Sequence, residues 1–280
     1  MSLVLSHWSA SWPALIVYAV LAGAHLTGLG RLLARGGAPA GRRTMIREAA
    51  LFQGGILLAL LAIVSPLGYE SGVFIWVRAV QDLVLAVVAP GLVVLGAPWP
   101  AFGARERSRP GWWLRWPLAT VAAFNVIWLA WHLPALYDRL PSSPGAQAAD
   151  YVLYLGAGTL FWLQVIGSRP WSPTAPPLRR ATLLIGTVVV DTVLGMVLVF
   201  GSGVVYPAYA NAAHHVMTVL DDQQLAGAVL WMGMLPPVVC AAVVVLMRWL
   251  DREETDALSV GFDRLLKPRA SAWASRSRYR

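Results

Sequence analysis

Charged residues are scarce in this 280-residue chain: they make up 13% of it, whereas hydrophobic residues make up 58%. A soluble domain of this size normally has about a quarter charged residues and under half apolar ones. The composition therefore excludes an ordinary soluble enzyme and a disordered protein. Cys240 is the one cysteine, which excludes an intrachain disulfide, a CxxC redox pair and a cysteine zinc site. The mean hydropathy of +0.60 predicts an integral membrane protein.

The sequence also lacks the short motifs of common enzymes. It contains no GxSxG elbow, no HExxH pair, no Walker loop and no GxGxxG string that opens a helix. We therefore expect no enzymatic activity. The formal charge of +8 does not indicate nucleic-acid binding, because the basic residues are spread over four segments without an RNA- or DNA-binding motif.

Long apolar runs dominate the chain, and seven of them can cross a hydrocarbon core of about 30 Å, which takes about 20 helical residues. Their approximate ranges are Pro13–Leu33, Ala49–Leu67, Phe74–Ala97, Leu114–Leu133, Tyr151–Gly167, Ala181–Gly203 and Leu225–Leu250. They do not alternate as barrel strands do, so helices must satisfy the backbone inside the bilayer. The sequence predicts an all-α, polytopic membrane protein with seven transmembrane helices over residues 1–250, followed by a basic cytoplasmic tail over 251–280.

Lys and Arg residues fall almost entirely on one side of these spans. Of the 22, all but Arg78 and Arg139 lie in the first, third and fifth connectors or in the tail. By the positive-inside rule, the N-terminus faces outward and the C-terminus is cytoplasmic. After Pro268 the tail is rich in Ser, Ala and Arg, and we expect no regular structure there.

Three acidic or imidazole residues, His25, Asp82 and Asp191, fall within the interior of the predicted spans. A charged group at the centre of a membrane helix costs roughly 2.5–3.5 kcal/mol, so each needs a partner or a function. Arg78 lies four residues before Asp82, which predicts an ion pair within one helix. Asp191 is interpreted as a hydrogen-bonded structural acid or as a proton or metal site. His25 is interpreted as a hydrogen-bonding residue of the core.

The last outer connector carries His214, His215 and Met217 within four residues. The soft sulfur of methionine favours Cu(I), and imidazole suits both oxidation states of copper, so this pattern indicates a copper site. The alternative is that the two histidines are an exposed pair that binds no metal. Asp222, beside Asp221, stands at the predicted start of the seventh helix, where a carboxylate favours the helix dipole. We expect it to be an N-terminal cap.

Several strings resemble those of the CtaG-type cytochrome c oxidase assembly proteins. They are WHLPALYD at 131–138, AP at 89–90 with LGAP at 95–98, LGAG at 155–158 with LFW at 160–162, YPAY at 206–209 and DQQLAG at 222–227. These blocks occur in the family's order and cover about residues 75–235. The resemblance implies a bacterial inner (plasma) membrane factor that helps to mature a haem–copper oxidase of the respiratory chain, at the stage of copper delivery.

The chain departs from the family pattern at the start of two spans. Where the family's third span opens with a His-x-x-Gln-His-type string, this chain has Arg78, Gln81 and Asp82. Where the fifth span opens with a His-x-x-Glu-His-type string, this chain has Gln147, Asp150 and Tyr151. His132 is the family histidine that remains. The resemblance therefore implies either that metal handling has moved elsewhere or that the scaffold is kept without that chemistry.

The leading hypothesis is an assembly factor that delivers copper, with His132, His214, His215 and Met217 as its ligands. Its partners would be oxidase subunits, a periplasmic copper chaperone and the lipid bilayer. A second hypothesis is a proton- or ion-coupled transporter that uses Asp191 and His25. A third is a structural scaffold that docks oxidase subunits without metal, and the pairing of Arg78 with Asp82 favours it.

Overall fold

The computed structural model describes residues 7–276 except 10, 36–38, 106–111 and 212–216, and this part of the chain is helical, without strands. The helices are α1 (Trp12–Ala34), α2 (Pro39–Val64), α3 (Pro66–Glu70), α4 (Ile75–Leu83), α5 (Ala89–Leu95), α6 (Pro117–Trp131), α7 (Pro134–Tyr137), α8 (Pro144–Val165), α9 (Pro177–Phe200) and α10 (Val219–Arg276). A π-helical segment, Val84–Val88, joins α4 to α5, and short 3₁₀ turns cover Trp112–Arg115 and Pro207–Asn211.

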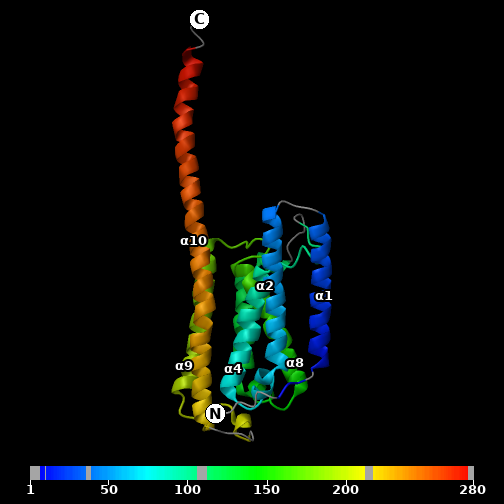
Figure 1. Cartoon of the computed structure of the whole chain (residues 1–280). Coiled ribbons are helices and arrows are strands. Elements are labelled where there is room, and N and C mark those ends of the chain that lie inside the picture. The colour runs from blue at the N-terminus through cyan, green and yellow to red at the C-terminus, as the bar shows by residue number, and fades with distance from the viewer. Residues whose placement is uncertain (1–6, 10, 36–38, 106–111, 212–216, 277–280) are drawn as a thin grey trace.

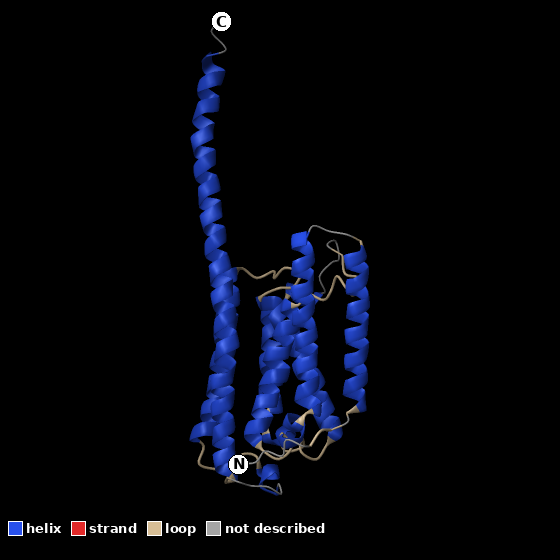
Figure 2. Ribbon diagram, viewed as in Figure 1, coloured by secondary structure: helices blue, strands red, loops and turns tan. Residues whose placement is uncertain are grey.

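The long helices form one bundle and run alternately up and down, with α1 at one edge and α9 and α10 at the other (Figures 1 and 2). Each of the seven predicted ranges overlaps a helix. Five helical segments are long and apolar enough to cross a membrane: Trp12–Ala34, Gly41–Val64, Ile75–Leu95, Pro177–Phe200 and Val219–Met247. The shorter α6 has 15 residues, and α8 is not among the five. The chain is a multi-pass membrane protein, and its seven-span count and orientation stay predictions.

Prolines set where most of the helices begin. A proline occupies one of the first two positions of α1, α3, α5, α6, α7, α8 and α9. At that position the missing N–H costs nothing, because the first N–H groups of a helix have no internal acceptor, and the fixed φ of proline suits the helix. Most of these prolines therefore mark the start of a helix, whereas Pro90 lies within the continuous α4–π–α5 segment and Pro236, Pro237 and Pro268 lie inside α10.

The central element is the rod formed by α4, the π-helical segment and α5. In its apolar 18-residue stretch 72% of the residues are buried, compared with 11% in that of α1. Pro90 cannot donate to a carbonyl four residues earlier, and the rod adopts π geometry just before it. The indole N–H of Trp162 on α8 donates to the Val87 carbonyl at 2.8 Å. Gly158, also on α8, packs so closely that a Cβ there would lie 2.1 Å from the Ala86 oxygen. The α8 helix thus rests directly on the backbone of the rod.

The last helix continues well beyond the bundle. It packs along α9, where Gly195 and Gly227 bring the two backbones together, and a Cβ at Gly227 would lie 2.7 Å from the Gly195 oxygen. Beyond this packed part α10 projects away from the other helices (Figure 1). The predicted boundary at 250/251 is not a break in the helix. The expected loss of regular structure after Pro268 is wrong, because α10 extends through Pro268 to Arg276.

The contact of α8 with the rod gives a stability prediction. We expect Gly158→Ala to lower the free energy of unfolding by about 1–3 kcal/mol, because the new methyl group must displace the backbone at Ala86. Gly156→Ala, on the same helix, is the matched control, since nothing lies within 4 Å of a Cβ at that position. Thermal unfolding of the two variants in detergent measures the difference. Equal midpoints for both would contradict the close packing.

Candidate functional site

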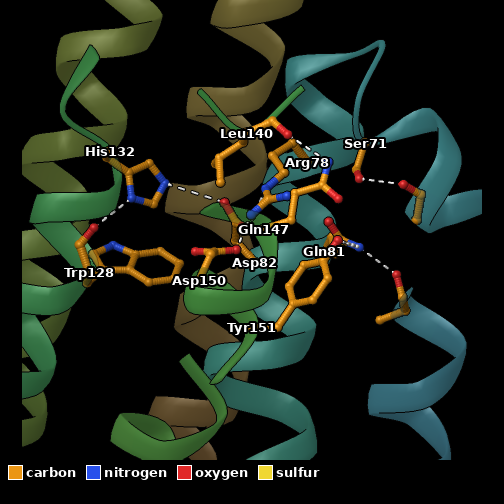
Figure 3. A network of polar contacts seen from close by, with 12 residues as sticks. Ser71, Arg78, Gln81, Asp82, Trp128, His132, Leu140, Gln147, Asp150 and Tyr151 are labelled. Carbon is orange, nitrogen blue, oxygen red and sulfur yellow. Dashed lines mark hydrogen bonds and ion pairs between the residues drawn. The ribbon is translucent and has the colours of Figure 1, made fainter. Parts of the chain in front are cut away.

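A buried arginine in the first turn of α4 is held by two carboxylates (Figure 3). Arg78 on α4 is 1% exposed. Its Nε lies 2.9 Å from Oδ1 of Asp82, which confirms the predicted pair within one helix. Its Nη2 is also ion-paired with Oδ2 of Asp150 on α8. The second carboxylate was not paired with Arg78 in the sequence analysis, because residues 78 and 150 come together only through the packing of α8 on α4.

His132 joins this group from the end of α6. Its Nδ1 lies 2.8 Å from the Trp128 carbonyl, which can only accept, so Nδ1 carries the proton and Nε2 is left as an acceptor. Nε2 is 3.9 Å from Oδ2 of Asp82 and points toward it in Figure 3. The backbone oxygen of His132 accepts a hydrogen bond of 2.9 Å from the Tyr206 hydroxyl. His132 therefore belongs to the same buried cluster as Arg78.

The other residues at which the chain departs from the family pattern lie near Arg78. The Arg78 guanidinium lies 5.6 Å from the centre of the Tyr151 ring, within cation–π range. Gln81 donates from Nε2 to the Ala62 carbonyl at 2.6 Å and to the Tyr151 hydroxyl at 3.4 Å. Gln147 donates to the Leu140 carbonyl at 2.6 Å. Positions 81, 82, 150 and 151 thus lie around Arg78, and His132 approaches this group at Asp82. We call Arg78, Asp82, His132, Asp150 and Tyr151 the arginine cluster.

Three tyrosines lie close to the arginine cluster, at the end of the bundle where α4 begins. Tyr137 stacks on Tyr206 with ring centres 4.2 Å apart, and the ring of Tyr209 lies 5.7 Å from that of Tyr137. Burial raises the pKa of all three hydroxyls, so they stay neutral at physiological pH. Our sequence analysis did not single them out, although YPAY and LYD are among the family-like strings. They seal one side of the cluster.

The arginine cluster is a charge site that does not suit copper. A fixed guanidinium occupies its centre, and its other groups are carboxylate or phenol oxygens and one imidazole, whereas Cu(I) prefers sulfur and nitrogen. Among the described residues, no group of three or more His, Cys, Asp or Glu side chains is arranged to hold a metal ion. Several buried acceptors have no hydrogen bond there: Oε1 of Gln81, both oxygens of Asp82, Oδ1 of Asp150 and Nε2 of His132.

The other predicted copper ligands are not placed in this cluster. Met217 is half-buried and lies just before α10. His214 and His215 lie outside the described residues, so the proposed set of His132, His214, His215 and Met217 stays a prediction.

The two residues of the transporter hypothesis lie on helices at opposite edges of the bundle (Figure 1). Asp191 on α9 is 1% exposed and lies beside the indole N–H of Trp128. His25 on α1 is hydrogen-bonded through Nδ1 to Gln53 at 3.2 Å and packs on the ring of Phe52. The bonding of His25 agrees with its interpretation as a hydrogen-bonding core residue.

Asp222 caps a helix other than its own, which corrects the expectation. Its carboxylate accepts from the Ile75 N–H at 2.8 Å and from the Trp76 N–H at 2.9 Å, the first residues of α4. The local cap of α10 is Thr218, whose Oγ1 accepts from the Asp221 N–H at 3.1 Å and donates to the Asp221 carboxylate at 2.6 Å. The start of α10 meets the start of α4, so this negative charge faces the positive end of the α4 dipole.

A comparison with protein families finds one match over most of the chain. The model described as cytochrome c oxidase caa3 assembly factor (Caa3_CtaG) matches residues 23–252. This range includes the whole arginine cluster. No curated protein and no solved structure matches the chain.

Loss of the central cation should destabilise the bundle. We expect Arg78→Gln to cost about 3–5 kcal/mol, because it leaves two buried carboxylates without their counter-charge. Adding Asp150→Asn to Arg78→Gln should recover part of this loss. Arg139→Gln is the matched control, since Arg139 is exposed. Unfolding midpoints in detergent provide the measurement, and an Arg78→Gln protein as stable as the control would contradict the role of the ion pairs.

Substitution of the adjacent residues Asp221 and Asp222 should lower the stability of the protein by different amounts. We expect Asp222→Ala to lower the free energy of unfolding by about 1.5–3 kcal/mol, because two buried N–H groups of α4 lose a charged acceptor. Asp221→Ala should cost less, about 0.5–1 kcal/mol, because it removes one exposed hydrogen bond to Thr218 and keeps the bond from the Asp221 N–H. Chemical unfolding of both variants gives the comparison. The reverse order would show that Asp222 does not hold the start of α4.

Proposed function

The chain belongs to the cytochrome c oxidase caa3 assembly factor family, and from this membership we propose that it assists assembly as a scaffold that docks immature oxidase subunits. The scaffold is not an enzyme and holds no metal in its core. It resides in a bacterial inner membrane, as a multi-pass protein whose outer end faces the periplasm.

The observation that carries this proposal is the pairing of Arg78 with Asp82 and Asp150. The guanidinium pairs with both carboxylates, so neither is free to bind a metal ion, and it fills the space at which the family-like histidine positions converge. The cluster ties α4 to α8, and His132 at the end of α6 lies beside it. Its contribution is to hold α4 and α8 in one arrangement, which is what a docking surface requires.

The outer end of the bundle is fixed by bonds between its connectors. The Ala208 N–H donates to Asp138 at 3.2 Å, and Tyr206 holds the end of α6 through the His132 carbonyl. Gln223 on α10 binds the preceding connector twice, accepting from the Val205 N–H at 2.6 Å and donating to the Gly203 carbonyl at 3.1 Å. A surface held in this way changes little on binding, so we assign the docking of oxidase subunits to this end.

Copper delivery is the second candidate function, and its site is confined to His214, His215 and Met217. Met217 precedes α10 at the same end of the bundle as His132, and thioether with imidazole suits Cu(I). A periplasmic copper chaperone would then be the partner at this end. In this alternative the arginine cluster remains structural, and the metal is held outside the bundle.

Deletion of the gene from its host separates the two candidates. We expect membranes of the deletion strain to lose oxidase activity and assembled oxidase, because subunits lack their docking partner, and added copper should not restore them. The His214→Ala/His215→Ala variant should restore both, and it should co-purify with oxidase subunits as well as the unaltered chain does. Oxidase activity, copper content and subunit co-purification are the measurements.

The opposite outcomes reject the scaffold. Rescue of the deletion strain by copper, together with failure of the His214→Ala/His215→Ala variant, would establish copper delivery. Full oxidase assembly in the deletion strain would reject both candidates. Asn211→Ala, in the neighbouring 3₁₀ turn, is the matched control for changes in this connector.

A further inference from the structure

The α1 helix is held loosely and leaves space between itself and the bundle. Only 11% of the residues in its apolar 18-residue stretch are buried, and its main neighbour is α2. Two cavities lie in sequence along it. One has a volume of about 300 Å³ and the next, toward the start of α1, about 770 Å³. They share the lining residues Ala14, Val17, Ile63 and Leu155. We call these two cavities together the α1 groove.

The middle of the α1 groove is apolar. Its walls come from α1 (Val17 and Leu21), from α2 (Ile56 and Leu60) and from Trp99 after α5. These residues lie in the middle of the α1 and α2 spans, at the depth of lipid chains. An apolar cavity in this position excludes water and ions and suits a hydrocarbon chain.

A polar cavity of about 500 Å³ lies at the other end of α1, and we call it the head cavity. Its lining includes His25, Met45, Glu48 and Arg169. Arg169 Nη2 is 2.5 Å from Glu48, and the Arg169 side chain is 64% exposed, so its guanidinium remains accessible. His25 lines the head cavity, Phe52 and Phe102 line the α1 groove, and the three rings contact one another. The head cavity and the α1 groove share no lining residue, so a chain that enters both must cross these rings, of which that of Phe102 is exposed.

Positive charge surrounds the head cavity. The exposed arginines at this end of α1 and α2 are Arg31, Arg35, Arg42, Arg43 and Arg47. Together with Arg169 they outnumber the single acidic side chain, Glu48, that lines the cavity. Basic pockets between membrane helices on the cytoplasmic side bind anionic lipid head groups. The charge therefore favours an anionic head group over a zwitterionic one.

We propose that the α1 groove and the head cavity together bind one anionic phospholipid. Its phosphate lies at Arg169 in the head cavity and a chain lies along Val17 in the groove. Both volumes fall within the range of about 300–1,000 Å³ that is usual for ligand sites. This site is independent of the arginine cluster and goes beyond the proposed role in oxidase assembly.

The dimensions argue against a helix of a partner protein as the occupant. A helical segment about 10 Å wide and about 15 Å long fills on the order of 1,200 Å³. The wider cavity of the groove offers about 770 Å³, but the narrower one, which a helix lying along the groove would also have to enter, offers about 300 Å³. A flexible hydrocarbon chain fits the narrower cavity, whereas a helix does not.

Native mass spectrometry of the full chain tests the proposal, after purification and exchange into detergent with equal amounts of phosphatidylglycerol and phosphatidylethanolamine of matched chain length. We expect one retained phosphatidylglycerol, favoured about fivefold over phosphatidylethanolamine. Arg169→Gln should bring this preference close to equality. Arg139→Gln, at the opposite end of the bundle, is its control and should keep the preference.

A second pair of variants tests the groove. Val17→Trp should block it and remove the retained lipid, whereas Ile16→Trp, on a neighbouring exposed position outside the lining, should not. Inorganic phosphate in excess should not displace phosphatidylglycerol, because the chain contributes to binding.

Four outcomes would overturn the site. They are no retained lipid, equal retention by the Val17→Trp and Ile16→Trp variants, an Arg169→Gln protein that keeps the preference, and displacement by phosphate alone. Loss of oxidase subunits from Val17→Trp with its lipid unchanged would assign the groove to a partner helix instead.

Discussion

A guanidinium group that water cannot reach must keep a carboxylate beside it, and Arg78 keeps two. One comes from its own helix and the other from α8, so the ion pairs bridge the two helices that pack most deeply in the bundle. Burial of an ion pair adds little net stability, but removal of one member is costly because the other is left alone. The cluster therefore specifies an arrangement of helices more than it strengthens it. The position of His132 and the tyrosines around it follow from that arrangement.

The strings that resemble the oxidase assembly family turn out to contact one another. Trp162 and Gly158, from the third of these strings, meet the rod at Val87 and Ala86, next to the AP pair. YPAY meets WHLPALYD through the bond of Tyr206 to His132 and that of Ala208 to Asp138. Asp222, from the last string, holds the start of α4. The family pattern is thus a pattern of contacts between helices, and it persists here although the polar centre has changed.

That division suggests how one scaffold serves more than one chemistry. The contacts that fix the backbone are separate from the side chains at the centre, so the centre is free to carry an ion pair where the family pattern has imidazoles. The proposed docking of oxidase subunits would use the outer connectors, which are held by Tyr206, Asp138 and Gln223. The proposed lipid site would use a third region, along α1. Each proposed role has its own part of the bundle.

The sequence by itself determined the membrane class, the approximate ranges of the helices and the Arg78–Asp82 pair. Hydropathy, proline positions and a spacing of four residues are local properties, and they need no knowledge of which helices are neighbours. Only the tertiary structure decided that Asp150 completes the pair, that Asp222 caps α4 rather than α10, and that a groove runs beside α1. Each of these joins residues that are far apart in the chain, and their meeting depends on how one helix packs against another.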